Sequence, residues 1–599
     1  MDIFGILSMI GGLALFLYGM EAMGDGLSKL SGGRMERLLE KLTSKRIMAV
    51  LLGAGVTAVI QSSSATTVMV VGFVNSGIMK LNQAVGIIMG ANIGTTITSW
   101  LLSLTGIQGS SFVLKMLKPS SFSPILAIVG IIFIMFTKDE KKKDIGGIFL
   151  GFAILMYGME AMSGAVAPLA DNEKFTGILT MFSNPILGLL AGTILTAVIQ
   201  SSSASVGILQ ALCATGAVNF STALPIIMGQ NIGTCVTAII SSIGTSKNAK
   251  RAAAVHLFFN ISGTVIFMVV FYTLNTFVHF SFLNTAASPA GIAVIHSLFN
   301  IGATILLFPF ANILEKIAIL AIPDKGSEVE EMEEEKINPD LARLDERFLD
   351  KPGFAMEECR GVAINMARKS KKAMNLAIDL LKEYDEKTSA RVEKLENQID
   401  QYEDALGTYL VKLSERDLSV KDSRTLSVLL HCIGDFERIS DHAVNIRDAA
   451  VEMNKKNLQF SDKAKQELLV FSNAIRDIID RAVLAFETGD TGLAKEVEPL
   501  EQVVDALNKE EKQRHINRLR TGTCTIELGF VLSDISTNFE RAADHCSNIA
   551  VCLLQVDEGG FDTHEYLDIL KEENSEEFRH EYMELSEKYA LPESKHGGK

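Results

Sequence analysis

The first half of this sequence has few charged residues, and no part of it has a dense basic patch. Residues 1–325 hold 19 Lys and Arg and 13 Asp and Glu, whereas the remaining 274 residues hold 37 and 58. The two parts therefore carry net charges of +6 and −21. This division excludes a single soluble globule, and the lack of basic patches argues against a nucleic-acid partner.

Paired cysteines and catalytic motifs are also lacking. The seven cysteines include no CxxC pair, so we expect neither a disulfide framework nor a zinc site. No HExxH motif, P-loop or nucleophile motif is present, so an enzyme, for example a metal-dependent phosphohydrolase, is the weakest hypothesis. The first apolar run has no basic residue before it, which favours a retained membrane helix over a cleaved signal peptide.

Long apolar runs indicate a polytopic membrane protein, because a helix crosses a bilayer in roughly 20 apolar residues. Two runs, about 48–77 and 187–216, are broken in the middle by polar residues. They are too long for one span and too short for two, which favours re-entrant hairpins. Seven other runs are predicted spans: about 3–23, 84–104, 123–137, 147–168, 222–243, 252–272 and 291–312.

Basic residues gather in alternate loops of this half. The loops 24–46, 138–146 and 244–251 carry most of them, while the three opposing loops hold only Lys115, Lys118 and Lys174. By the positive-inside rule, the basic loops face the cytoplasm. Seven crossings with the N-terminus outside then place the acidic C-terminal half in the cytoplasm as well.

The membrane half repeats itself at a constant offset of 139 residues. TAVIQSSSA at 57–65 recurs at 196–204, and YGMEAM and NIGT recur at the same offset. We place repeat one at about 1–137 and repeat two at about 147–246, followed by two more spans up to residue 322. Each repeat contains three crossings, an odd number, so the second copy is predicted to be inverted.

The polar residues inside the two broken runs are the candidate binding residues. Hydroxyls and free helix N-termini suit an oxyanion, whereas hydroxyl and amide oxygens suit a hard cation such as sodium. Neither run contains Lys or Arg, so a bound anion would need a co-bound cation; the alternative is serine-mediated helix packing. The residues are Gln61, Ser62, Ser63, Ser64, Gln200, Ser201, Ser202 and Ser203, and Asn92, Thr95, Asn231, Thr234 and Thr237 add similar ligands nearby.

A shorter sequence repeat relates His256 and Asn260 to His296 and Asn300, at an offset of 40 residues. His and Asn four residues apart lie on one helix face. Hydrogen bonding between membrane helices is the favoured interpretation, and substrate contact is the alternative.

The two QSSS segments, followed by GANIGT and GQNIGT, resemble the type II sodium–phosphate cotransporter family over about residues 1–315. The resemblance implies inorganic phosphate as substrate, sodium as coupling ion and phosphate bound by the serines of both motifs. It assigns sodium to Gln200, Ser201, Thr234 and Thr237.

The charged half follows an acidic linker, placed at 323–350, and shows helical periodicity throughout 351–590. We predict two groups of three helices and a final helix at about 564–588. The groups comprise about 355–384, 387–416 and 422–454, then 460–488, 491–519 and 524–556.

These groups also repeat, at an offset of 103. Carboxylates recur on equivalent helix faces, where they could bind metal or form ordinary ion pairs with neighbouring Arg and His. The duplicated ExxxDHxxNI pattern resembles the PhoU family, paired three-helix bundles linked to phosphate signalling, some of which bind metal clusters. The candidate ligands of iron, zinc or magnesium are Glu396, Asp400, Glu437, Asp441, Glu501, Asp505, Glu540 and Asp544.

Together these features predict an all-α fold: a polytopic transporter of two inverted repeats with re-entrant hairpins, then a cytoplasmic PhoU-like pair of three-helix bundles. The predicted function is sodium-dependent phosphate transport across a bacterial inner membrane by alternating access. A membrane-tethered phosphate sensor and a phosphate exporter are the alternatives. A dimer or a phosphate-signalling protein partner is left open.

Overall fold

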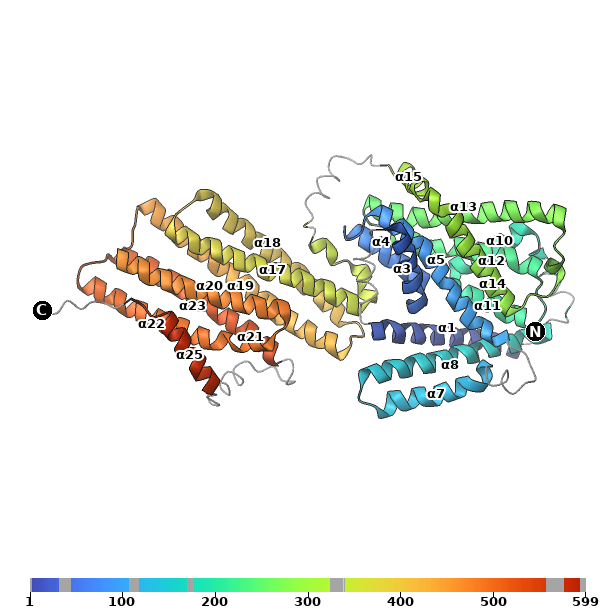
Figure 1. Ribbon diagram of the computed structural model, residues 1–599, viewed down its shortest axis with the longest axis horizontal. Helices are drawn as coiled ribbons and strands as arrows, with labels where there is room; N and C mark the ends of the chain where they lie inside the picture. The colour runs from blue at the N-terminus through green and yellow to red at the C-terminus, as the bar shows by residue number, and fades with distance from the viewer. Residues whose placement is uncertain are drawn as a thin grey trace. The chain divides into compact units, whose positions relative to one another are not determined.

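The chain forms two helical units, Met1–Phe354 and Ala355–Lys599 (Figure 1). Within the described residues, regular structure is helical apart from one isolated bridge between Asn219 and Ala286. The computed structural model describes residues 3–31, 45–106, 118–169, 172, 177, 179, 181–323, 338, 340–555 and 576–592. The linker stretch 326–337 and residues 564–575 of the predicted last helix lie outside these ranges.

Six helical segments of the first unit are long and apolar enough to cross a membrane, where the sequence predicted seven. The seventh prediction, 123–137, falls in the helix α7 (Pro119–Phe136), whose apolar part is shorter. The six segments lie in α1 (Ile3–Ser31), α5 (Leu81–Ser103), α8 (Glu140–Val166), α12 (Phe220–Ser241), α13 (Lys247–Val278) and α14 (Pro289–Leu307) continued by α15 (Ala311–Ala321).

The two broken runs each form a pair of short helices. The first pair is α3 (Arg46–Ile60) and α4 (Ser63–Asn75), and the second is α10 (Pro185–Ile199) and α11 (Ser202–Ala214). Every bound of the second pair equals that of the first plus 139. The sequence repeat is therefore a structural repeat as well.

Glycines let the helices of each repeat approach closely. A methyl group at Gly90 of α5 would fall within 3 Å of the Val50 backbone of α3, and one at Gly229 of α12 would meet Leu189 of α10 in the same way. Gly19 of α1 and Gly158 of α8, both from the repeated YGMEAM, pack against each other's helix equally tightly. Small residues thus replace the bulky core of a soluble protein where membrane helices pack.

The second unit contains two groups of three long helices, as the periodicity predicts. Their apolar faces meet through aromatic pairs such as Phe471 with Phe539, whose ring centroids lie 5.2 Å apart. The first group is α17 (Pro352–Lys382), α18 (Glu386–Ser414) and α19 (Val420–Lys456). The second is α20 (Asp462–Thr488), α22 (Val497–Arg520) and α23 (Ile526–Gln555), with the short α21 (Thr491–Lys495) between its first two members and α25 (Glu576–Lys588) after its last.

Candidate functional site

Each QSSS motif is the point at which a helix pair breaks. Gln61 and Gln200 adopt left-handed backbone conformations, with φ of 60° and 59°. Ser62 then caps α4 by accepting a hydrogen bond from the Ala65 amide (3.1 Å), and Ser201 caps α11 in the same way. A non-glycine residue at positive φ is uncommon, so this turn is a strained feature present in both repeats.

The two breaks meet in the fold. The Oγ atoms of Ser63 and Ser202, the first residues of α4 and α11, lie 3.4 Å apart and are buried. The Ser64 hydroxyl also lies 3.5 Å from the carbonyl oxygen of Gln200. Two helix N-termini with free backbone N–H groups and hydroxyl donors therefore converge, which is an arrangement suited to an oxyanion.

Of the predicted phosphate ligands, the structure groups the middle and last serines most closely. Ser63, Ser202 and Ser203 are buried, and Ser64 reaches the opposite repeat. Ser62 and Ser201 use their hydroxyls as helix caps. The sequence could not separate these roles, because each motif holds three consecutive serines and does not show which of them caps the helix.

The two repeats differ in how they satisfy equivalent polar groups. In repeat one, Thr98 donates to the Gln61 side chain (2.9 Å), which is buried. The equivalent Thr237 instead donates to the carbonyl of Thr234 (2.9 Å), and Gln200 is exposed. Thr98 was missed by the sequence analysis, although its position, 139 residues before Thr237, could have revealed it.

A second difference lies beside the first. In repeat one, Thr57 donates to Thr66 (3.0 Å) inside the hairpin. Their counterparts Thr196 and Ser205 are fully buried, and within the described part of the chain neither hydroxyl has a hydrogen-bond partner. The amide of Gln230 on α12 is equally buried and unpartnered there. Repeat two thus holds unsatisfied oxygen atoms where repeat one is internally bonded, and such atoms suit water or a hard cation.

The predicted sodium ligands Asn92 and Asn231 bond across helices. Asn92 donates to Asn260 (2.7 Å), and Asn231 donates to Asn300 (2.6 Å). The preferred interpretation of the repeated His and Asn pairs as helix–helix hydrogen bonding is therefore confirmed for the asparagines.

The other hydroxyls and rings of these clusters have different roles. Thr95 and Thr234 bond to carbonyls of their own helices, four residues earlier. The rings of His256 and His296 are buried without a hydrogen-bond partner among the described residues.

In the second unit, the histidines and the carboxylates of the repeated motif make different contacts. His442 bonds to Asn538 (2.8 Å) and His545 to Asp435 (2.8 Å), and the two rings stack 5.6 Å apart. These contacts join α19 to α23 with twofold pseudosymmetry, at the offset of 103. The two histidines therefore help to hold the two bundles together.

The predicted metal ligands are gathered only in part. Oxygen atoms of Glu501, Asp505 and Asp544 lie within 4.8 Å of one another. The fourth, Glu540, accepts a hydrogen bond from Asn508. The carboxylates of this cluster carry like charges and lie close together. Burial, and then the charge of Glu540, raise the pKa of Asp544. A divalent cation would relieve that repulsion, and metal binding here stays a prediction.

In the first bundle, an arginine contacts the equivalent carboxylates. Arg438 lies 3.5 Å from Glu437 and 3.7 Å from Asp441, as the ion-pair alternative predicts. Burial, and then the charge of Asp441, still raise the pKa of Glu437 to about 7. Glu396 has a raised pKa as well, from burial and then from Asp441 and Asp400.

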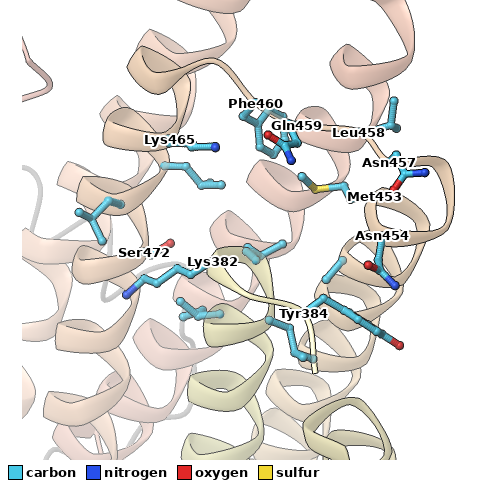
Figure 2. Close-up of a pocket in the computed structure, with 16 residues that line it drawn as sticks. Lys382, Tyr384, Met453, Asn454, Asn457, Leu458, Gln459, Phe460, Lys465 and Ser472 are labelled. Atoms are coloured by element: carbon cyan, nitrogen blue, oxygen red, sulfur yellow. The ribbon is translucent and has the colours of Figure 1, made fainter. Parts of the chain in front are cut away.

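A cavity of about 450 Å³ lies where α17 and α19 end and α20 begins (Figure 2). Lys382 and Lys465 line it together with Tyr384, Phe460 and Asn454, and none of its lining residues is acidic. In a half of the chain with an excess of carboxylates, this lining suits a ligand with an apolar body and an anionic group. No motif in the sequence indicated it.

Comparison with known proteins agrees with this division. A family model described as Na+/Pi-cotransporter matches residues 15–164 and 154–296, and a model described as PhoU domain matches 363–450 and 468–553. The chain is 24% identical over 526 residues to the putative inorganic phosphate export protein YjbB of Salmonella typhimurium, covering 86% of this chain and 91% of that protein.

Two further relatives match shorter parts of the chain. The uncharacterized protein YqeW of Bacillus subtilis is 29% identical over 322 residues, which are 53% of this chain and 99% of that protein. The sodium-dependent phosphate transport protein 2A of Rattus norvegicus is 39% identical over 113 residues, which are 18% of this chain and 17% of that protein.

Proposed function

We propose that this chain, which carries two copies of a Na+/Pi-cotransporter domain followed by PhoU domains, is a phosphate transporter of the bacterial plasma membrane that releases phosphate from the cytoplasm. The observation that carries the proposal is the convergence of α4 and α11 at Ser63 and Ser202. Phosphate would bind there between the two helix N-termini, with the serine hydroxyls as donors.

The arrangement of the repeats supports alternating access. The end of α4 lies beside Ser246, in a loop that the positive-inside rule assigns to the cytoplasm. The stretch after α11 pairs with the loop of Ala287, assigned to the outside (Ala287 N to Val218 O, 2.7 Å). The two hairpins thus enter from opposite faces as re-entrant elements of an inverted pair, and the site between them can open to either side in turn.

Sodium is proposed to bind within repeat two. Gln200 is exposed, and Thr196, Ser205 and Gln230 bury oxygen atoms that have no partner among the described residues. A cation held there would also supply the positive charge that the hairpins lack near a bound anion. Gln200, Ser201, Thr234 and Thr237 complete the proposed set.

Export is the proposed direction because relatives that match 86% of this chain, including both of its halves, are named putative inorganic phosphate export proteins. A high cytoplasmic phosphate concentration would drive release. The PhoU-like half, on the cytoplasmic side, is proposed to adjust the rate.

Flux through reconstituted protein tests this function. Proteoliposomes loaded with labelled phosphate should release it down its gradient, and replacing sodium by choline should slow the release. Phosphate that binds without net flux would contradict transport and favour the membrane-tethered sensor. Sodium-independent release would retain transport and refute the proposed coupling ion.

Removing the unpartnered hydroxyls of repeat two tests the sodium site. We expect Thr196→Val with Ser205→Ala to raise the sodium concentration for half-maximal flux by about tenfold, as expected for two lost ligand oxygens. If these hydroxyls do not bind sodium, their removal should leave the sodium dependence unchanged, and it should not lower the stability of the protein, because buried hydroxyls without partners do not stabilise it. The matched control is Thr57→Val with Thr66→Val, which removes the bonded pair of repeat one and should not alter sodium dependence.

A further inference from the structure

The residues just before the second unit pack onto the end of the first hairpin. Residues 340–350, here called the latch, form two short 3-10 turns. The Phe348 ring is 1% exposed and lies against Gly72 of α4, with the Phe73 ring 5.4 Å away, centroid to centroid. The sequence placed this segment in the acidic linker 323–350, yet its Phe348 side chain is as buried as the core.

 Gly72 leaves the space that the Phe348 ring occupies. A methyl group at Gly72 would fall within 3 Å of that ring. The equivalent position of repeat two, 139 residues later, is Ala211, and the structure records no corresponding aromatic contact there among the described residues. Repeat one therefore has a glycine, where repeat two has an alanine, at the position against which the latch packs.

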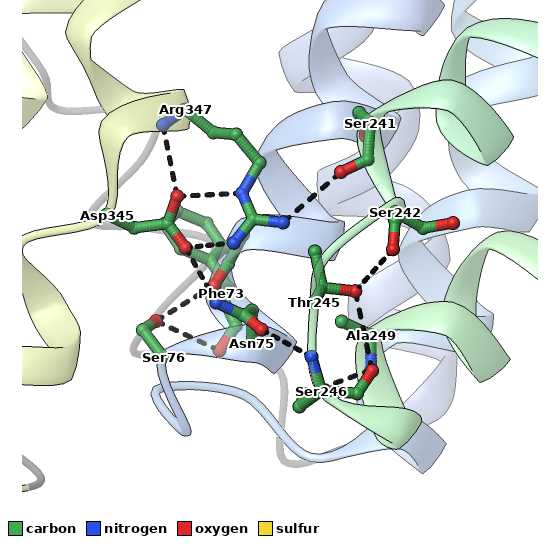
Figure 3. Close-up of polar contacts among 11 residues, drawn as sticks. Phe73, Asn75, Ser76, Ser241, Ser242, Thr245, Ser246, Ala249, Asp345 and Arg347 are labelled. Atoms are coloured by element: carbon green, nitrogen blue, oxygen red, sulfur yellow. Dashed lines mark hydrogen bonds and ion pairs between the residues drawn. The ribbon is translucent and has the colours of Figure 1, made fainter. Parts of the chain in front are cut away.

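Polar contacts fix the other side of the latch (Figure 3). Asp345 is buried, accepts a hydrogen bond from Asn75 (2.9 Å) and pairs with Arg347, whose Nε lies 2.7 Å from its Oδ1. Arg347 also donates to the carbonyl of Ser241 at the end of α12 (3.3 Å). A guanidinium at a helix C-terminus is favourable, because it meets free carbonyls and the negative end of the helix dipole.

Asn75 connects three parts of the unit. Its amide donates to Asp345, while its Oδ1 accepts from the backbone N–H of Ser246, the residue that caps α13. The end of the first hairpin is thereby tied both to the loop between α12 and α13 and to the latch. Alternating access needs hairpin one to move relative to these elements, so the tie opposes that movement.

We propose that the latch is a built-in brake, which holds the cytoplasmic end of hairpin one against α12 and α13 and slows phosphate transport until it is released. This inference rests on the proposed function and adds its regulation. One residue, Lys351, separates the latch from α17, which begins at Pro352, so the latch lies directly before the PhoU-like half in the chain.

Two single substitutions should release the latch in the full-length protein. Gly72→Ala pushes against the Phe348 ring and favours the helix by about 1 kcal/mol, so α4 should persist. Asn75→Asp keeps the acceptor for Ser246 but places a carboxylate opposite Asp345 in place of a donor. Adding Asp345→Asn to Asn75→Asp exchanges the two groups and should restore the bond. Gly164→Ala, with nothing within 4 Å of the new methyl, is the control.

Each variant is measured in two ways: hydrogen exchange of residues 340–350 by mass spectrometry, and phosphate efflux from proteoliposomes. We expect faster exchange and about fivefold faster efflux in each single variant, the lower end of usual coupling between sites, and a return of both in the exchanged pair. Faster exchange with unchanged or slower efflux would refute the brake. Unchanged exchange in both single variants would refute the docking. If neither the parent nor any released variant transports phosphate, the proposed function fails, and the brake fails with it.

Discussion

Replacing Ser63 and Ser202 together by alanine is expected to abolish phosphate flux while the protein stays folded in the membrane. Their hydroxyls lie 3.4 Å apart at the meeting point of α4 and α11. Each hydrogen bond to a charged ligand is worth about 1.5–3 kcal/mol, so losing two should slow flux by about 100-fold or more. Labelled-phosphate efflux from proteoliposomes measures the effect.

The choice of serine matters for this experiment. Ser62 and Ser201 cap the two helices, and removing a cap costs about 1 kcal/mol of stability, so loss of flux in that pair would have two explanations. Ser103→Ala is the control, because that hydroxyl is buried and bonds to the carbonyl of Trp100. Normal flux in a well-expressed variant of Ser63 and Ser202 would refute the proposed site.

Gly90→Val with Gly229→Val is expected to prevent the hairpins from docking, so that little folded protein is recovered. Each new Cβ would meet backbone atoms of the neighbouring helix, Val50 for one and Leu189 for the other. Backbone cannot move aside as a side-chain end can, so each substitution should cost about 3 kcal/mol or more. The yield of monodisperse protein in detergent, by size-exclusion chromatography, measures the loss.

The control for the glycine variant lies on α3, the helix that Gly90 contacts. Gly55 of α3 is exposed, and a methyl group there has nothing within 4 Å. Gly55→Val should therefore give the normal yield. Equal losses from the two variants would show that membrane insertion, and not close packing, limits recovery.

Much of the fold follows from periodicity and repetition. The offset of 139 predicts the equal bounds of the hairpin helices, and the helical spacing of the second half predicts its two bundles. Helix breaks were predictable because Gln and Ser inside an apolar run mark a change of environment. Six helices are long and apolar enough to be spans where the sequence predicted seven, because the apolar part of α7 among the described residues is shorter than the others.

The motif of the second unit shows a limit of such patterns. Its spacing places Glu, Asp and Asn on one helix face, which the sequence analysis interpreted as one possible ligand set. The structure uses His442 and His545 for the contact between bundles and, of the predicted ligands, brings together Glu501, Asp505 and Asp544. Spacing along a helix fixes the face of a residue but not the partner that the face meets.

By itself, the sequence determined the two membrane repeats, their helix breaks and the presence of Na+/Pi-cotransporter and PhoU domains. Only the tertiary structure decided how the repeats differ. Identical motifs bond Gln61 to Thr98 in one copy and leave Gln200 exposed in the other, and Phe348 of the latch packs on Gly72 and Phe73 of the first hairpin. The reason is physical: the two copies have nearly the same local sequence but different neighbours, and hydrogen bonds and packing depend on the neighbours.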